Sequence, residues 1–149
     1  MSDLSSPMKK RALVTWVNEQ IQHGHPRWPL YIRLSKMQSE SVDVNEMQVL
    51  ADVMDSLESQ LVDRNLKGIE LEKRGNEEQA IALYEANVAD YFDGSHPYDR
   101  LRVLYKNRGN YTSAIRVCEA YIAHSGQDQK LCKSFRAEID KFKSKLSGS

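Results

Sequence analysis

Apolar residues recur every three or four positions along most of the chain, and this spacing predicts an all-α protein. The clearest stripe consists of Met47, Leu50, Met54, Leu57 and Leu61. Its alternating spacings of three and four indicate an amphipathic helix with a narrow seam, of the kind that packs antiparallel on a neighbour. Asp43 or Asn45 is expected to cap this helix at its start.

An earlier stripe predicts a first helix that begins at Ser6-Pro7, with Ser6 as the cap, and ends near Gln22. It is made of Leu13, Trp16, Val17 and Ile21. Two prolines and a glycine predict an irregular linker over 23–29. A short helix is expected over 30–39, with a short strand at Tyr31-Ile32 as the alternative, and then a polar turn.

The apolar spacing slips between Leu61 and Leu66, although no Gly or Pro separates the two residues. We therefore expect a break near 58–63, with one long continuous helix as the alternative. The next helix should cover 62–74, with Leu66, Ile69 and Leu71 as its apolar residues.

One phrase occurs twice, at an offset of 34 residues. Residues 74–81 are RGNEEQAI, and residues 108–115 are RGNYTSAI. Self-similarity at this period is typical of stacked helix–turn–helix repeats. Gly75 is expected to end a helix in the left-handed conformation, and the mid-helix Gly68 indicates a close approach by a neighbouring helix.

The last predicted helix, 128–146, is in the same register but has no second helix after it. Its apolar residues are Leu131, Cys132, Phe135, Ile139, Phe142 and Leu146, and its other face carries Lys130, Lys133, Arg136, Lys141, Lys143 and Lys145. A single helix with one polar face is typical of the cap of a repeat array. We expect 147–149 to be disordered.

The two repeats resemble the tetratricopeptide family. The residues that carry the resemblance are Gly68, Leu71, Gly75, Ala80 and Tyr84 in the first repeat, and Tyr98, Leu101, Tyr105, Gly109 and Ala114 in the second. The second repeat departs from the family at Arg102, Cys118 and Pro97. The resemblance implies an α-α superhelix: an N-terminal helix and linker (1–26), a degenerate repeat (27–60), two repeats (61–127) and a capping helix (128–146).

The family binds proteins or peptides in a groove lined by the first helix of each pair, so the resemblance implies an adaptor or scaffold. Carried over by position, the groove residues would be Val62, Asn65, Ile69, Glu72, Lys73, His96, Asp99, Val103, Lys106, Asn107, Lys130, Lys133, Ala137 and Lys141. Some members clamp a peptide carboxylate with Lys and Asn. Here those places hold Asn65 and Ile69, so we expect no such clamp.

Charge is distributed unevenly although the net charge is zero. Residues 42–98 hold four basic and thirteen acidic residues, or −9, while 99–149 hold eleven and five, or +6. The basic end is expected to attract acidic partners. Head-to-tail self-association is the alternative function, and the seam of Met47, Leu50, Met54 and Leu57 could also pair across a two-fold axis if the first helix leaves it open. Nucleic-acid binding by the last helix is less favoured, because Phe135 and Phe142 belong to its apolar stripe.

No catalytic motif, metal-ligand spacing or cofactor loop is present, so we expect neither an enzyme nor a metal or cofactor site. His23 and His25 lack supporting ligands, and His96 near Asp99 fits helix capping better than catalysis. Cys118 and Cys132 are expected to be small apolar residues in a reducing compartment. With no membrane-spanning run and no secretory signal, the expected location is cytoplasmic.

Overall fold

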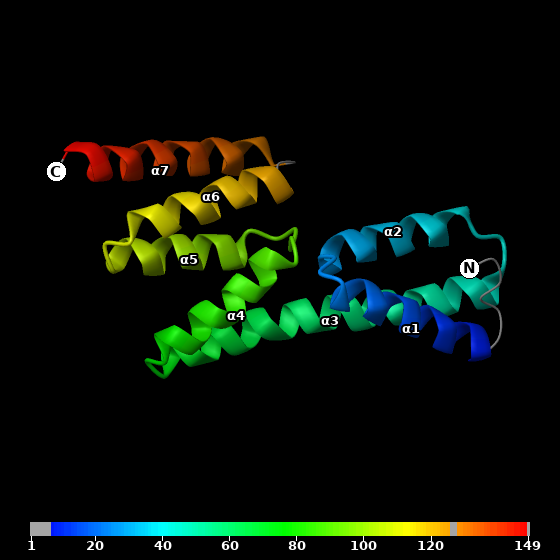
Figure 1. Cartoon of the computed structure of the whole chain (residues 1–149). Coiled ribbons are helices and arrows are strands. Elements are labelled where there is room, and N and C mark those ends of the chain that lie inside the picture. Colours follow the sequence, from blue (N-terminus) through cyan, green and yellow to red (C-terminus); the bar gives the residue numbers. More distant parts are fainter. Residues whose placement is uncertain (1–6, 126–127, 149) are drawn as a thin grey trace. The chain divides into compact units, whose positions relative to one another are not determined.

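The computed structural model describes residues 7–125 and 128–148, and within these residues the protein is helical, with no strand (Figure 1). The helices are α1 (Pro7–Gln22), α2 (Arg27–Glu40), α3 (Val44–Lys73), α4 (Glu77–Ala89), α5 (His96–Asn107), α6 (Tyr111–Ser125) and α7 (Gln129–Gly148). The all-α prediction is confirmed. The strand alternative at Tyr31-Ile32 is wrong, because both residues lie inside α2. No helix of the described chain is both long and apolar enough to cross a membrane.

The chain forms two compact units, an N-terminal unit that ends at Val62 and a C-terminal unit that begins at Asp63. Each unit has its own hydrophobic core. The N-terminal core gathers side chains from α1, α2 and the first part of α3, and the C-terminal core gathers them from the last part of α3 to α7. Helix α3 therefore supplies residues to both units.

In the N-terminal unit, α1 and α2 cover the seam of α3. Leu50, Met54 and Leu57 are buried with Leu13 of α1 and Leu34 of α2. The seam is thus not open for pairing across a two-fold axis. Asp43 caps α3 as expected, because its Oδ1 accepts hydrogen bonds from the backbone N–H groups of Asn45 (2.8 Å) and Glu46 (3.2 Å).

The linker before α2 is shorter than the sequence suggested. It covers only 23–26, and Pro29 is the third residue of α2. A proline is tolerated there because the first N–H groups of a helix have no partner within it. Trp28 stacks on Tyr31, with ring centroids 4.7 Å apart.

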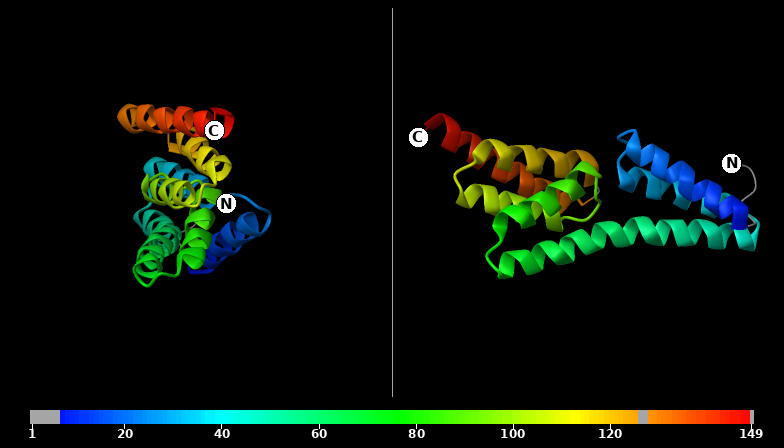
Figure 2. Two further views of the ribbon diagram at one scale, coloured as in Figure 1. Left: turned by 90° about the vertical axis from the view of Figure 1, so that its left-hand side faces the viewer. Right: turned by 60° about the horizontal axis from the view of Figure 1, so that its bottom comes forward.

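The expected break near 58–63 is wrong, because α3 is one continuous helix of 30 residues (Figure 2). The buried stripe does not slip at Leu66, which is 60% exposed. It passes instead from Leu61 through Asn65 and Gly68 to Leu71, all of them buried. A polar residue and a glycine at buried positions hid this continuity in the hydrophobic pattern.

In the C-terminal unit, α4 to α7 form an array in which each helix packs on the next (Figures 1 and 2). The repeated phrase makes the same turn twice. Gly75 (φ 81°) and Gly109 (φ 69°) are left-handed, as expected for Gly75. The N–H of Asn76 bonds to the carbonyl of Leu71, and that of Asn110 bonds to Tyr105. Both turns are Schellman motifs, which end α3 and α5 at equivalent positions.

The capping helix α7 buries most but not all of its apolar residues. Cys132, Phe135, Ile139 and Phe142 are buried, whereas Leu131 and Leu146 are exposed. The expected disorder at 147–148 is wrong, because α7 continues to Gly148. The predicted cap Ser6 and the final Ser149 lie outside the described residues.

Candidate functional site

The face formed by the last turns of α3 together with α5 and α7 is the predicted groove of the C-terminal unit, and we call it the inner face. Direct side-chain contacts connect these three helices. Arg100 of α5 contacts Glu72 of α3, and Arg102 of α5 contacts Glu138 of α7. The first helix of each predicted pair therefore lies beside the next.

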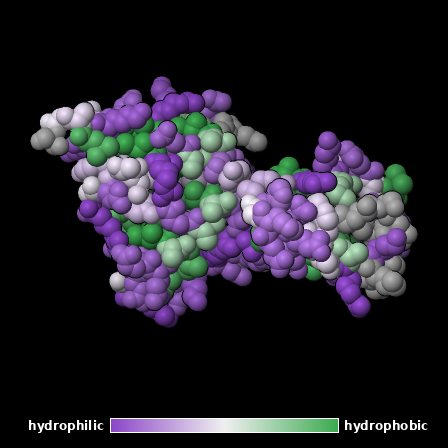
Figure 3. Space-filling view, viewed as in Figure 1, coloured by the Kyte–Doolittle hydropathy of each residue, from purple (hydrophilic) through white to green (hydrophobic). Residues whose placement is uncertain are grey.

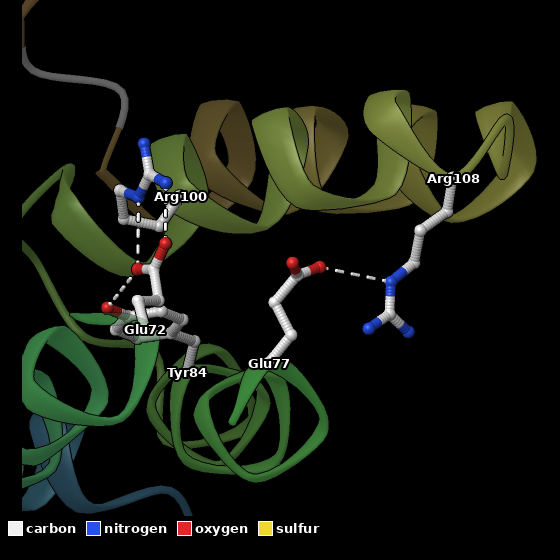
Figure 4. Close-up of polar contacts among 5 residues, drawn as sticks. All are labelled: Glu72, Glu77, Tyr84, Arg100 and Arg108. Carbon is white, nitrogen blue, oxygen red and sulfur yellow. Dashed lines mark hydrogen bonds and ion pairs between the residues drawn. The ribbon is translucent and has the colours of Figure 1, made fainter. Parts of the chain in front are cut away.

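Glu72 is the centre of the contact between α3, α4 and α5 (Figure 4). Arg100 donates from Nη2 to Oε1 (2.5 Å) and from Nε to Oε2 (3.1 Å), and Tyr84 of α4 donates its hydroxyl to Oε2 (2.6 Å). Burial alone would raise the pKa of Glu72, but these hydrogen bonds and the charge of Arg100 outweigh it and hold the pKa below its usual range. Glu72 is therefore a paired carboxylate inside this unit.

The contact between α5 and α7 also uses an arginine. Arg102 donates from Nη2 to Oδ1 of Asp99 (2.6 Å), and its Nη1 lies 3.5 Å from Oε1 of Glu138. Two more arginines pair with carboxylates of α4. Arg108, which follows α5, contacts Glu77 and Glu78 (Figure 4 shows the Glu77 pair), and Arg116 of α6 contacts Glu85. Arginine suits these positions because its planar guanidinium binds carboxylates with fixed geometry.

His96 begins α5 and packs edge-on against Tyr84, with ring centroids 5.5 Å apart. Its Nε2 is buried and has no hydrogen-bond partner among residues 7–125 and 128–148. Burial, and then the charge of Arg100, lower the pKa of His96, against the opposing effect of Glu72 and Asp99. Its ring is consequently a neutral packing group here.

The lysines of the predicted groove differ from these arginines. Lys73, Lys106, Lys130, Lys133 and Lys141 are exposed, and none makes a hydrogen bond or ion pair with the described residues. By contrast, Glu72, Asp99 and Glu138 are paired with arginines. Asp140 is an exposed carboxylate on α7 beside Lys141. The exposed charge of this face is therefore mainly positive.

The uncharged groove residues occupy several environments. Ile69 and Val103 are half-buried on α3 and α5, while Asn107 and Ala137 are exposed. Val62 is the last residue of the N-terminal unit and is partly exposed. Asn65 is buried, and its Oδ1 accepts a hydrogen bond (2.9 Å) from Nδ2 of Asn87. The side chain of Asn65 is thus used in packing α3 on α4.

Arg64 extends this polar contact by donating to Oδ1 of Asn87 (3.1 Å) and to Oδ2 of Asp90 (2.6 Å). Neither the hydrophobic pattern nor the repeated phrase predicts the interhelical contacts of Arg64, Arg100 and Arg102. The 34-residue alignment gives no signal for Arg100, because the equivalent residue in the first repeat is the exposed Leu66.

Helix α7 has a hydrophilic side and a hydrophobic side that both run along its length. Figure 3 shows hydrophilic residues along its outer edge and hydrophobic residues beneath them. Phe135 and Phe142, the aromatic residues of this helix, are buried. They are therefore unavailable for stacking on nucleic-acid bases, while the lysines remain exposed.

Comparisons with protein-family models, curated proteins and solved structures find no match for this chain. In the described residues, no three His, Cys, Asp or Glu side chains gather as a set of metal ligands.

Proposed function

We propose that the chain is a tetratricopeptide-type adaptor, whose inner face binds an acidic segment of a protein partner. Two features support the family: helix pairs whose two members are joined by equivalent Schellman turns 34 residues apart, and a single terminal helix in the same register. Arrays of this kind present extended concave surfaces for binding.

The preference for an acidic segment rests on one observation. The carboxylates that connect α3, α5 and α7 are paired with arginines, whereas Lys106, Lys130, Lys133 and Lys141 are exposed and have no ion pair with any residue that the structure describes. The carboxylates of a partner can therefore pair with these lysines without breaking an ion pair within the described residues. Lysine also suits a surface that steers partners, because its ammonium is a mobile point charge. Half-buried Ile69 and Val103 add apolar contact.

The test uses the full chain and fluorescently labelled peptides that alternate Glu with Leu, titrated in an anisotropy assay. The triple variant Lys130→Glu/Lys133→Glu/Lys141→Glu is expected to weaken binding at least about tenfold, which corresponds to about 1.4 kcal/mol. Raising the salt concentration should weaken binding to the native chain, because exposed charges are screened.

A matched control separates a local site from overall charge. Arg11→Glu/Lys36→Glu/Lys67→Glu makes the same change in net charge at three exposed cations outside α5 and α7. We expect this variant to bind within about threefold of the native chain, since distant exposed charges are screened. Equal losses in the two triple variants, or no binding to the native chain, would exclude the proposed face.

A further inference from the structure

The N-terminal unit has a surface that the proposed adaptor role does not use. The turn between α2 and α3 presents Val42, which is 98% exposed, and Val44, which is 77% exposed. We call these two residues the valine finger. Single exposed apolar residues are ordinary, but two largely exposed valines at one tip form an apolar projection.

Hydrogen bonds hold this finger in a defined shape. The Ser41 Oγ accepts from the Asp43 N–H (3.2 Å), and the Ser41 N–H donates to the Gln38 carbonyl (3.2 Å). The Gln38 side chain in turn donates to the Met47 carbonyl (3.1 Å), and the Asp43 side chain caps α3. An ordered tip loses little conformational entropy when it binds.

The same unit contains a matching depression, which we call the α1–α3 groove. It is a cavity of about 240 Å³ that is open to solvent. The ion pair between Lys10 and Asp52 (3.1 Å) lies at its edge. The rest of its lining is part apolar and part polar: Val14, Val17, Val53 and Leu57, with Asn18, Ser56 and Gln60. An apolar cavity of about 150 Å³ already accepts a benzene molecule. The α1–α3 groove therefore has room for aliphatic side chains.

The charges beside the two features are complementary. Lys10 and Arg11 lie in the first two turns of α1, and the first turn has no acidic residue. Arg11 is exposed and unpaired among the described residues, and the positive end of the helix dipole lies nearby. Glu40 and Glu46 lie on either side of the finger, and their carboxylates have no ion pair with the residues that the structure describes.

We infer that a second copy of this chain is the occupant: the valine finger of one copy inserts into the α1–α3 groove of another, with Glu40 and Glu46 near the basic start of α1. The contact joins two different surfaces, so it forms chains of copies unless the geometry closes a ring. It involves only the N-terminal unit and does not rest on the proposed adaptor function.

The test is sedimentation of the full chain over a concentration series up to about 1 mM, because a contact of this size is weak. The native chain should associate as its concentration rises. The finger variant Val42→Ser/Val44→Ser and the groove variant Val14→Asp should each raise the dissociation constant at least about tenfold. Ile32→Ser, which changes another exposed aliphatic residue of this unit, should not.

Mixing the two variants gives the decisive result. The finger variant keeps its groove, and the groove variant keeps its finger, so an equal mixture should form heterodimers that neither variant forms with itself. If circular dichroism shows that Val14→Asp loses helix, Asn18→Arg fills the same groove from an exposed position. A native chain that is monomeric throughout, or a mixture that does not associate, would overturn the inference.

Discussion

The same crossing of two helices is packed in opposite ways in the two repeats. In the first, Gly68 of α3 faces Tyr84 of α4 so closely that a Cβ on Gly68 would lie 2.5 Å from the ring. Thirty-four residues later the equivalent positions hold Arg102 and Cys118. Burial raises the pKa of Cys118 to about 12, and the nearby charge of Arg102 opposes this rise only in part. The large side chain thus comes from the second helix in one repeat and from the first in the other.

Gly68→Ala should destabilise the protein by about 1–3 kcal/mol, because the added methyl group overlaps a ring whose hydroxyl is bound to Glu72. Urea unfolding of the full chain measures the change. Lys67→Ala at the exposed neighbouring position is the control, and it should stay within about 0.5 kcal/mol of the native chain.

A double-mutant cycle shows whether the tyrosine ring is the cause. In a Tyr84→Leu background the shorter side chain leaves room for the methyl group, so Gly68→Ala should cost less than it does in the native chain. An unchanged cost would mean that the strain arises elsewhere in α3.

At this scale the sequence predicts local roles better than distant partners. Gly68 at a helix crossing and Gly75 in a left-handed turn follow from what glycine alone permits. The pairing of Glu72 with Arg100 does not follow from the local sequence, because it depends on how two helices that are distant in sequence align. The same limit applies to the site. The sequence shows the lysines of α7, but it does not show which carboxylates are already paired with arginines.

Among the elements, α3 is the one whose form departs most from its hydrophobic pattern. Its continuity follows from backbone chemistry, since no Gly or Pro lies between Val44 and Lys67. The hydrophobic pattern predicted a break that does not exist, because Asn65 is buried with a hydrogen bond to Asn87 while Leu66 is exposed. Hydrophobic spacing detects a stripe only where burial and hydrophobicity coincide.

Ser59→Pro tests this continuity. Ser59 is exposed in the interior of α3, so a proline there removes a helix hydrogen bond and clashes with the preceding turn. We expect a loss of about 3 kcal/mol or more in the free energy of unfolding, together with a loss of helical circular dichroism. Ser59→Ala should be neutral or slightly stabilising. Tolerance of the proline would instead favour a turn near this residue.

Two separate cores are the main feature of the whole molecule. The N-terminal core includes residues from Leu13 to Leu57, and the C-terminal core includes residues from Leu71 to Phe142, with no shared member among the described residues. A 34-residue period signals the C-terminal array, but it gives no information on how the residues before it pack.

The segment 63–149 is therefore expected to fold alone. It contains the C-terminal core and the helix contacts made by Glu72, Arg100 and Arg102, and it would begin with Asp63, a residue favoured at a helix start. Thermal unfolding followed by circular dichroism should show a helical fragment with one cooperative transition. A fragment that lacks this transition would mean that the N-terminal unit is required for folding.

The two cysteines give this molecule a built-in chemical reporter. Cys118 and Cys132 are free and buried, both belong to the C-terminal unit, and the sequence has no others. The thiolate is the nucleophile that attacks an alkylating reagent, so a buried cysteine is labelled only when the C-terminal core opens. The rate of labelling then measures the opening of the C-terminal unit in the full chain, because the N-terminal unit has no cysteine and gives no signal. No dye or added residue is needed. The full chain can thus report the stability of its array separately from that of the three-helix packing before it.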